Sequence, residues 1–133
     1  MKTRYICVNP QDPEQNAIDL AAEVIRRGGL AAFPTETVYG LGANGLDPEA
    51  VRSIFAAKGR PADNPLILHI AAIEEAERLV KTVTPNAAAL MQRFWPGPLT
   101  VVLEKSDIVP LVVTGGLGTV AIRLPESLVA RKL

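Results

Sequence analysis

Two cations, an amide and the only histidine of the chain lie within one short segment, from Phe55 to Ile70. Arginine offers a planar fork and lysine a point charge, so Lys58 and Arg60 together suit a phosphate or a carboxylate. Asn64 follows, and His69 lies in the apolar run LILHI, where it would donate to a substrate carboxylate. A solvated helix end and a core histidine bonded to backbone are the structural alternatives. The segment predicts an anion-binding site.

Two further polar features lie at expected strand ends. Thr35 and Thr37 flank a glutamate directly after a buried strand, and glycines that let a ligand approach the backbone follow them. Thr119 and Arg123 are four residues apart in an expected strand and therefore face the same side. A turn cap and an exposed strand face are the alternatives. Together these groups predict a cleft that binds and orients anionic reactants, without an obvious general base.

Several common kinds of site are absent from the sequence. It has no phosphate-binding G-x-x-x-x-G-K-[ST] loop, no G-x-G-x-x-G directly after the expected first strand at 4–8 and no G-x-S-x-G elbow. Cys7 is the only cysteine, and we expect it to be buried in a strand as a structural residue. With one cysteine and one histidine, a metal site made by the protein is not expected.

Hydrophobic spacing, proline and glycine predict the elements that would position these groups. Strands are expected at 4–8, 30–33, 66–70, 99–103, 111–113 and 119–124. Helices are expected from 13 to 27, 48 to 58, 73 to 81 and 85 to 95, with another beginning near 126. The apolar face of the first helix would comprise Ala17, Leu20, Ala21 and Val24. Helices that alternate with strands predict an α/β fold, but the strand order cannot be read from the sequence.

Length and composition predict one globular domain over residues 1–133. Hydrophobic residues make up 48% of the chain, which is enough to form a core. Fourteen basic side chains balance fourteen acidic ones, so no overall basic field favours nucleic acid. No apolar stretch approaches the roughly 20 residues of a membrane span, and the N-terminus does not resemble a signal peptide. We therefore expect a cytoplasmic location.

Four motifs resemble a known family. PTETVYGLG, KGRPADNPLILHI, FWPGPLT and GTVAIRLP, in this order and spacing, look like the YrdC-like domain, the catalytic domain of threonylcarbamoyl-AMP synthases. The resemblance runs from about Ala17 to Pro125 and implies a twisted open mixed sheet with interleaved helices. Family members continue beyond the RLP strand to a serine-alanine-asparagine segment. We therefore expect a domain with its C-terminal part missing, and weak or no synthase activity from this chain alone.

The resemblance also implies a reaction and a set of roles. The family joins L-threonine, bicarbonate and ATP, with Mg²⁺, into threonylcarbamoyl-AMP and pyrophosphate, and the product serves the modification of adenosine 37 in tRNA by downstream proteins. Thr35 and His69 would contact threonine, and Arg123 would contact its carboxylate. The expected ATP contacts are Lys58, Arg60, Asn64 and Thr119, and the expected cleft-lining residues are Thr37, Pro98 and Thr100.

Two other functions remain open from the sequence. A carbamoyl-adenylate-forming domain, like that of the hydrogenase-maturation carbamoyltransferase, would share the fold and the anion cleft. A non-catalytic module that binds double-stranded RNA or tRNA would use a local basic face, although a net charge of zero argues against tight binding.

Overall fold

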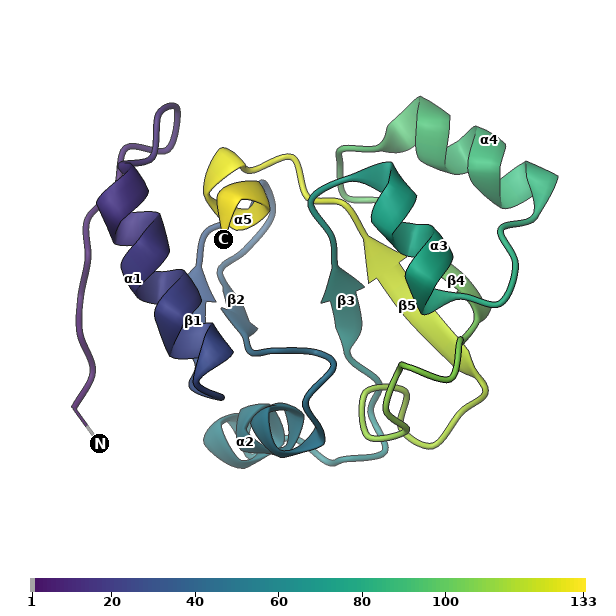
Figure 1. Cartoon of the computed structure of the whole chain (residues 1–133), viewed down its shortest axis with the longest axis horizontal. Coiled ribbons are helices and arrows are strands. Elements are labelled where there is room, and N and C mark those ends of the chain that lie inside the picture. Colours follow the sequence, from purple (N-terminus) through teal and green to yellow (C-terminus); the bar gives the residue numbers. More distant parts are fainter. Residues whose placement is uncertain (1) are drawn as a thin grey trace.

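The computed structural model describes residues 2–133 and contains two small sheets with helices around them (Figure 1). Helices and strands alternate along most of the chain, which confirms the α/β class. The helices are α1 (Gln15–Arg26), α2 (Pro48–Lys58), the short 3-10 helix η1 (Ile73–Glu75), α3 (Ala76–Leu79), α4 (Pro85–Phe94) and α5 (Leu128–Lys132). The strands are β1 (Ala31–Phe33), β2 (Gly40–Gly42), β3 (Ile67–His69), β4 (Val101–Glu104) and β5 (Thr119–Arg123).

The strand pairing places two of the predicted site residues side by side. Strands β1 and β2 form an antiparallel pair, whereas the second sheet has the order β3-β5-β4. In that sheet β3 runs parallel to β5 and β4 runs antiparallel to it, so the expected mixed sheet is confirmed. The register between β3 and β5 pairs His69 directly with Arg123. Paired residues project to the same face of a sheet, which brings an imidazole and a guanidinium to one edge of the fold.

Helix α2 ends where the predicted anion-binding segment begins, and both of its ends have clear physical causes. At the start, the Asp47 carboxylate accepts hydrogen bonds from the backbone N–H groups of Glu49 and Ala50. At the end, Gly59 has a φ of 59°, a left-handed conformation that glycine adopts without steric cost. The helix therefore stops immediately after Lys58.

Replacing Asp47 with alanine should destabilise the chain by about 1 kcal/mol, because the first turn of α2 would lose its side-chain cap. Chemical denaturation followed by circular dichroism measures this difference. An Asp47→Ser variant restores an N-cap acceptor and should recover most of the loss. Equal stability of the alanine variant and the wild type would show that the cap contributes nothing.

The main core lies around β5. Val120 and Ile122 of this strand are 1% exposed, and they pack with buried side chains from the surrounding helices, such as Val51 of α2 and Met91 of α4. Trp95, just after α4, is also buried, and its indole N–H donates to the Leu99 carbonyl at 2.7 Å. Within residues 2–133, no helix has the length and apolar character needed to cross a membrane. The core thus fixes β5 and, with it, Arg123.

The N-terminal predictions were partly wrong. No strand forms at 4–8, where Tyr5 is 91% exposed and Cys7 is exposed rather than buried, because this segment pairs with no strand in the described part of the chain. Helix α1 begins two residues later than expected and buries Ala17, Ile18 and Ala22. Leu20 and Val24 of the predicted face are each 45% exposed.

Two internal elements also differ from the expectation. The predicted helix at 73–81 divides into η1 and α3 and stops at Val80, which turns to an extended conformation and bridges to Lys105. The predicted strand at 111–113 is a series of turns, in which the N–H of Val113 donates to the carbonyl of Pro110. The first change follows from pairing with a distant segment, and the second from a local hydrogen bond.

Candidate active site

One cavity of about 440 Å³ brings together most of the predicted site residues. Its wall includes all three residues of β2 and of β3, so it lies between the two sheets. Six of the ten predicted site residues line it, namely Thr35, Thr37, Lys58, Arg60, His69 and Arg123. These residues come from four separate parts of the sequence, and the fold thus assembles the expected cleft.

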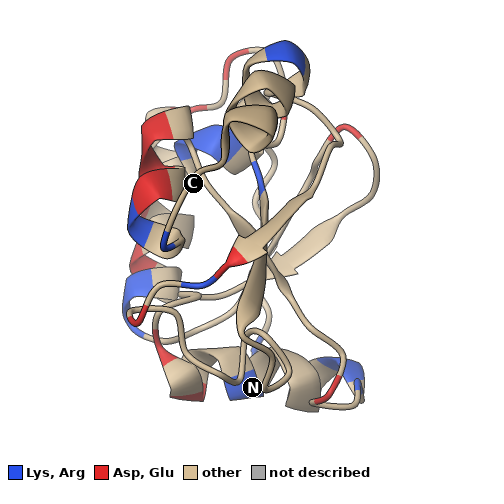
Figure 2. Cartoon of the chain, turned by 90° about the vertical axis from the view of Figure 1, so that its right-hand side faces the viewer, with Lys and Arg blue, Asp and Glu red and all other residues tan. Residues whose placement is uncertain are grey.

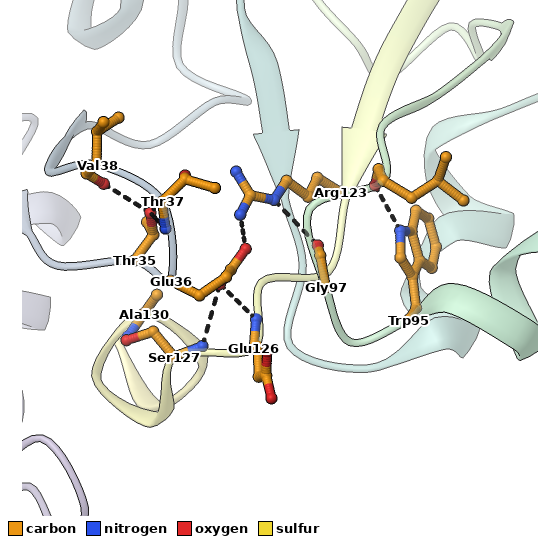
Figure 3. A network of polar contacts seen from close by, with 11 residues as sticks. Thr35, Glu36, Thr37, Val38, Trp95, Gly97, Arg123, Glu126, Ser127 and Ala130 are labelled. Carbon is orange, nitrogen blue, oxygen red and sulfur yellow. Dashed lines mark hydrogen bonds and ion pairs between the residues drawn. The ribbon is translucent and has the colours of Figure 1, made fainter.

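A tight polar turn after β1 forms one wall, and Figure 3 shows it in detail. The Thr35 hydroxyl donates to the Val38 carbonyl at 2.6 Å and accepts from the Thr37 backbone N–H at 3.2 Å. The two threonine hydroxyls are 3.0 Å apart, so Thr37 must be the donor between them. A hydroxyl has one proton and two lone pairs. Thr35 is therefore fully used within the turn, whereas Thr37 keeps acceptor sites for a ligand.

Arg123 at the end of β5 is held on two sides (Figure 3). Its Nε–H donates to the Gly97 carbonyl at 3.1 Å, and its guanidinium forms an ion pair with Glu36. The Arg123 side chain is only 10% exposed, and burial lowers the pKa of the guanidinium below its usual value. Arginine nevertheless stays protonated in proteins. The site thus holds a fixed positive charge with N–H groups remaining for a ligand.

The turn that carries the Gly97 carbonyl is itself tied to β5. The Gly97 N–H donates to the carbonyl of Leu124 at 2.9 Å. A side chain at this position would place its Cβ 2.6 Å from the Phe94 carbonyl oxygen, which explains why a glycine stands here. The orientation of Arg123 therefore depends on a rigid neighbour.

His69 lies beside Arg123 and outside the core, so the alternative of a core histidine is wrong. It is exposed to the cavity and packs edge-on against Phe33, with ring centroids 6.1 Å apart. Its Nδ1 lies 3.2 Å from the Ile67 carbonyl, an oxygen that can only accept, so this contact requires a proton on Nδ1. In the neutral ring Nε2 is then an acceptor. In this tautomer Nε2 could accept from a ligand N–H or O–H, whereas the protonated ring could donate to a carboxylate, so the predicted contact of His69 with threonine stays a prediction.

The only imidazole of the chain should titrate below its ordinary pKa of 6.5, because burial lowers the pKa of His69 more than the Ile67 carbonyl raises it. The unfolded chain then binds this proton at higher pH than the folded chain. The contribution of His69 to the free energy of unfolding is therefore fully present above pH 6.5. It is lost as the pH falls from 6.5 towards the pKa that His69 has in the folded chain. Imidazole NMR signals recorded against pH measure the midpoint, and a midpoint at or above 6.5 would contradict the assignment.

Lys58 and Arg60 form the cationic end of the cavity. One guanidinium nitrogen of Arg60, Nη2, donates to the side-chain oxygen of Asn64 and to the Pro65 carbonyl, both at 2.8 Å. Arg60 is thereby held in place, and its Nε is buried without a hydrogen-bond partner in the described part of the chain. Lys58 is exposed at the end of α2. Together they present one fixed fork and one mobile charge, which suits a group with several anionic oxygens.

Four predicted site residues are not among those that line the cavity. Asn64 acts on Arg60 instead. Thr119 is at the far end of β5, about 13 Å from Arg123 at the usual rise per strand residue. Pro98 and Thr100 precede β4, and β5 separates that strand from β3 and the cavity. Their contacts to ATP or to the cleft stay predictions.

Comparison with known proteins decides the family. The Sua5/YciO/YrdC family model, described as "Telomere recombination", matches residues 23–133. The chain belongs to the Sua5/YciO/YrdC family. It is 62% identical over 120 residues to a threonylcarbamoyl-AMP synthase of Pyrococcus abyssi, and 51% identical to one of Bacillus subtilis. These matches cover 90% of this chain but 35% and 34% of the relatives, so the chain spans about a third of their length.

A solved structure of a Sua5/YciO/YrdC relative shares the fold. The crystal structure of P. abyssi Sua5 complexed with L-threonine superposes with a TM-score of 0.89 at 60% identity. It covers 91% of this chain and 36% of that one. The resemblance seen in the four motifs is thereby confirmed at the level of family and fold.

Sequence reasoning missed one residue of this Sua5/YciO/YrdC site. Glu36 was seen only as the middle of the Thr35–Thr37 turn, yet its carboxylate pairs with Arg123. The sequence predicts three fixed cations for the cleft, Lys58, Arg60 and Arg123, and the carboxylate of Glu36 lies against the last of them. The available signal was a carboxylate within a polar turn directly after a buried strand, but no spacing rule links it to a residue so far along the chain.

The cavity offers few protein ligands for the Mg²⁺ that is expected with ATP. Thr37 contributes a hydroxyl, but none of the described residues that line the cavity is an aspartate or glutamate. Residues 2–133 also contain no group of three His, Cys, Asp or Glu side chains placed to hold a metal. Because Mg²⁺ prefers carboxylate and phosphate oxygens, these residues do not fit an ion held by the protein.

Proposed function

We propose that this domain carries the substrate site of a threonylcarbamoyl-AMP synthase, which uses L-threonine, bicarbonate and ATP and releases pyrophosphate. The observation that carries the proposal is the single cavity on which Thr37, His69, Arg123, Lys58 and Arg60 converge. Support comes from the P. abyssi and B. subtilis relatives, which are both named threonylcarbamoyl-AMP synthase, and from the solved relative complexed with L-threonine.

The polar groups near Arg123 match the functional groups of a hydroxy amino acid. The guanidinium suits a carboxylate, for which arginine supplies paired donors. The Thr37 hydroxyl and His69 Nε2 are acceptors, and they suit the ammonium and hydroxyl groups of threonine. One cation and two acceptors at one end of the cavity thus favour an amino acid over a simple dicarboxylate.

Lys58 and Arg60 would take the triphosphate of ATP at the other end. In the proposed reaction the threonine nitrogen forms a bond to the carbon of bicarbonate with loss of water. The proton released from the threonine ammonium in this step passes to solvent water. An oxygen of the resulting carbamate then attacks the α-phosphorus, and the bond to pyrophosphate breaks. The two cations would compensate the charge that develops on the departing pyrophosphate. Mg²⁺ would travel with the nucleotide phosphates.

The product would supply the threonylcarbamoyl group for adenosine 37 of tRNA, through downstream modification proteins in the cytoplasm. Direct RNA binding by this domain is less favoured. Figure 2 shows basic and acidic residues interspersed over the helices, and the net charge is zero. No observation favours the carbamoyltransferase alternative over the synthase.

Titration of L-threonine and ATP, separately and together, tests the proposal, with pyrophosphate release measured as each reactant is omitted. We expect saturable binding of both ligands, and pyrophosphate release only where threonine and bicarbonate are present. Release that does not depend on threonine would contradict the synthase. A salt-dependent gel shift with tRNA, without threonine binding, would instead favour the RNA-binding module.

A further inference from the structure

Within residues 2–133, Glu36 forms an ion pair with Arg123, which lines the cavity, although Glu36 does not line the cavity itself. One carboxylate oxygen, Oε1, contacts the Arg123 guanidinium. The other, Oε2, accepts from the backbone N–H groups of Glu126 and Ser127 at 2.8 and 3.4 Å. The Glu36 side chain is 18% exposed. This carboxylate thus joins the turn after β1, the end of β5 and the start of α5.

The contacts of Arg123 divide its donors into two sets (Figure 3). Nε is used by the Gly97 carbonyl, and Nη2 faces Glu36. Among residues 2–133 Nη1 has no such partner, and Arg123 lines the cavity. A guanidinium is planar, so two contacts on different nitrogens fix both its position and the plane in which the remaining N–H groups point. Without Glu36, only the Gly97 contact would restrain it.

We propose that Glu36 is a positioning residue that holds Arg123 in the orientation needed to receive the carboxylate of the amino-acid substrate. This inference rests on the proposed function of the cavity and adds a role for a residue outside it. A preorganised arginine loses little rotational freedom when a carboxylate binds, and affinity rises for that reason. The negative charge of Glu36 also balances the buried guanidinium while the cavity is empty.

The test compares L-threonine with L-threoninamide, which lacks the anionic carboxylate, by calorimetric titration of the wild type and a Glu36→Gln variant. We expect the variant to bind L-threonine about tenfold more weakly, with no change for the amide ligand. In an Arg123→Met background, Glu36→Gln should cause no further loss. The matched control is Glu126→Gln, which removes an exposed carboxylate from the segment between β5 and α5, whose backbone contacts Glu36, and should change the affinity for neither ligand.

Three results would overturn the inference. Unchanged or tighter L-threonine binding by Glu36→Gln would show that Glu36 does not position Arg123. An equal loss for both ligands would show a general structural defect. The third result comes from hydrogen exchange of the Arg123 Nε–H, measured without ligand. We expect faster exchange in Glu36→Gln than in the wild type, and equal rates would contradict the inference. Failure of wild-type L-threonine binding would instead count against the proposed function.

Discussion

An Arg123→Met variant should lose at least about 100-fold in affinity for L-threonine. A hydrogen bond to a charged group contributes about 1.5–3 kcal/mol, and two such bonds to a carboxylate give about 3 kcal/mol or more. Each 1.4 kcal/mol corresponds to a tenfold change in affinity. Methionine keeps much of the side-chain volume but offers no donor. Calorimetric titration measures the change.

The same substitution should also destabilise the fold, because Glu36 would lose its buried cation. Removing one partner of a buried ion pair lowers the free energy of unfolding by about 3–5 kcal/mol. Because Glu36 is partly exposed, we expect a loss at the lower end, about 3 kcal/mol. The double variant Arg123→Met, Glu36→Gln removes both charges and should recover part of the stability without recovering L-threonine affinity. Retained affinity in a folded Arg123→Met variant would exclude Arg123 as the carboxylate receptor.

Arg60→Ala should weaken ATP binding by about 100-fold. Arg60 is already fixed by Asn64 and Pro65, so its free N–H groups would meet phosphate oxygens with little loss of conformational entropy. Lys58→Ala should have a smaller effect, about tenfold, because a mobile lysine acts as a point charge. Fluorescent-nucleotide displacement measures both affinities.

Matched controls separate this effect from damage to the fold. Arg52 lies on the same helix as Lys58 but does not line the cavity, and Arg52→Ala should leave ATP affinity unchanged. Arg60→Lys keeps the charge without the fork and should recover only part of the loss. ATP affinity that survives Arg60→Ala and Lys58→Ala alike would place the nucleotide elsewhere.

Elements with strong local causes could be predicted from the sequence. Helix α2 has an aspartate cap, a proline at its first position and a glycine at its end, and all three act within a few residues. Strand β5 was predicted because an apolar run between turn residues favours a strand. The segment at 4–8 has similar composition but no partner strand, and partnership is a long-range property.

The sequence predicted which residues belong to the site better than it predicted the contacts among them. Polar residues at strand ends identified Thr37, His69 and Arg123, and the fold places all three on one cavity. The use of each hydrogen-bonding group depends on neighbours distant in sequence. The pairing of Glu36 with Arg123 and the distance of Thr119 from the cavity became evident only when the strands were placed.

The most direct test of the central claim is a titration of the isotopically labelled chain with L-threonine, followed by two-dimensional NMR. At 14.2 kDa the chain suits this method. We expect saturable shifts at Thr37, at the His69 imidazole and at the Arg123 Nε–H, with Thr119 and the residues of α4 unaffected. No saturable shift in the folded chain, or shifts confined to residues away from the cavity, would contradict the assignment of this cavity to the amino-acid substrate.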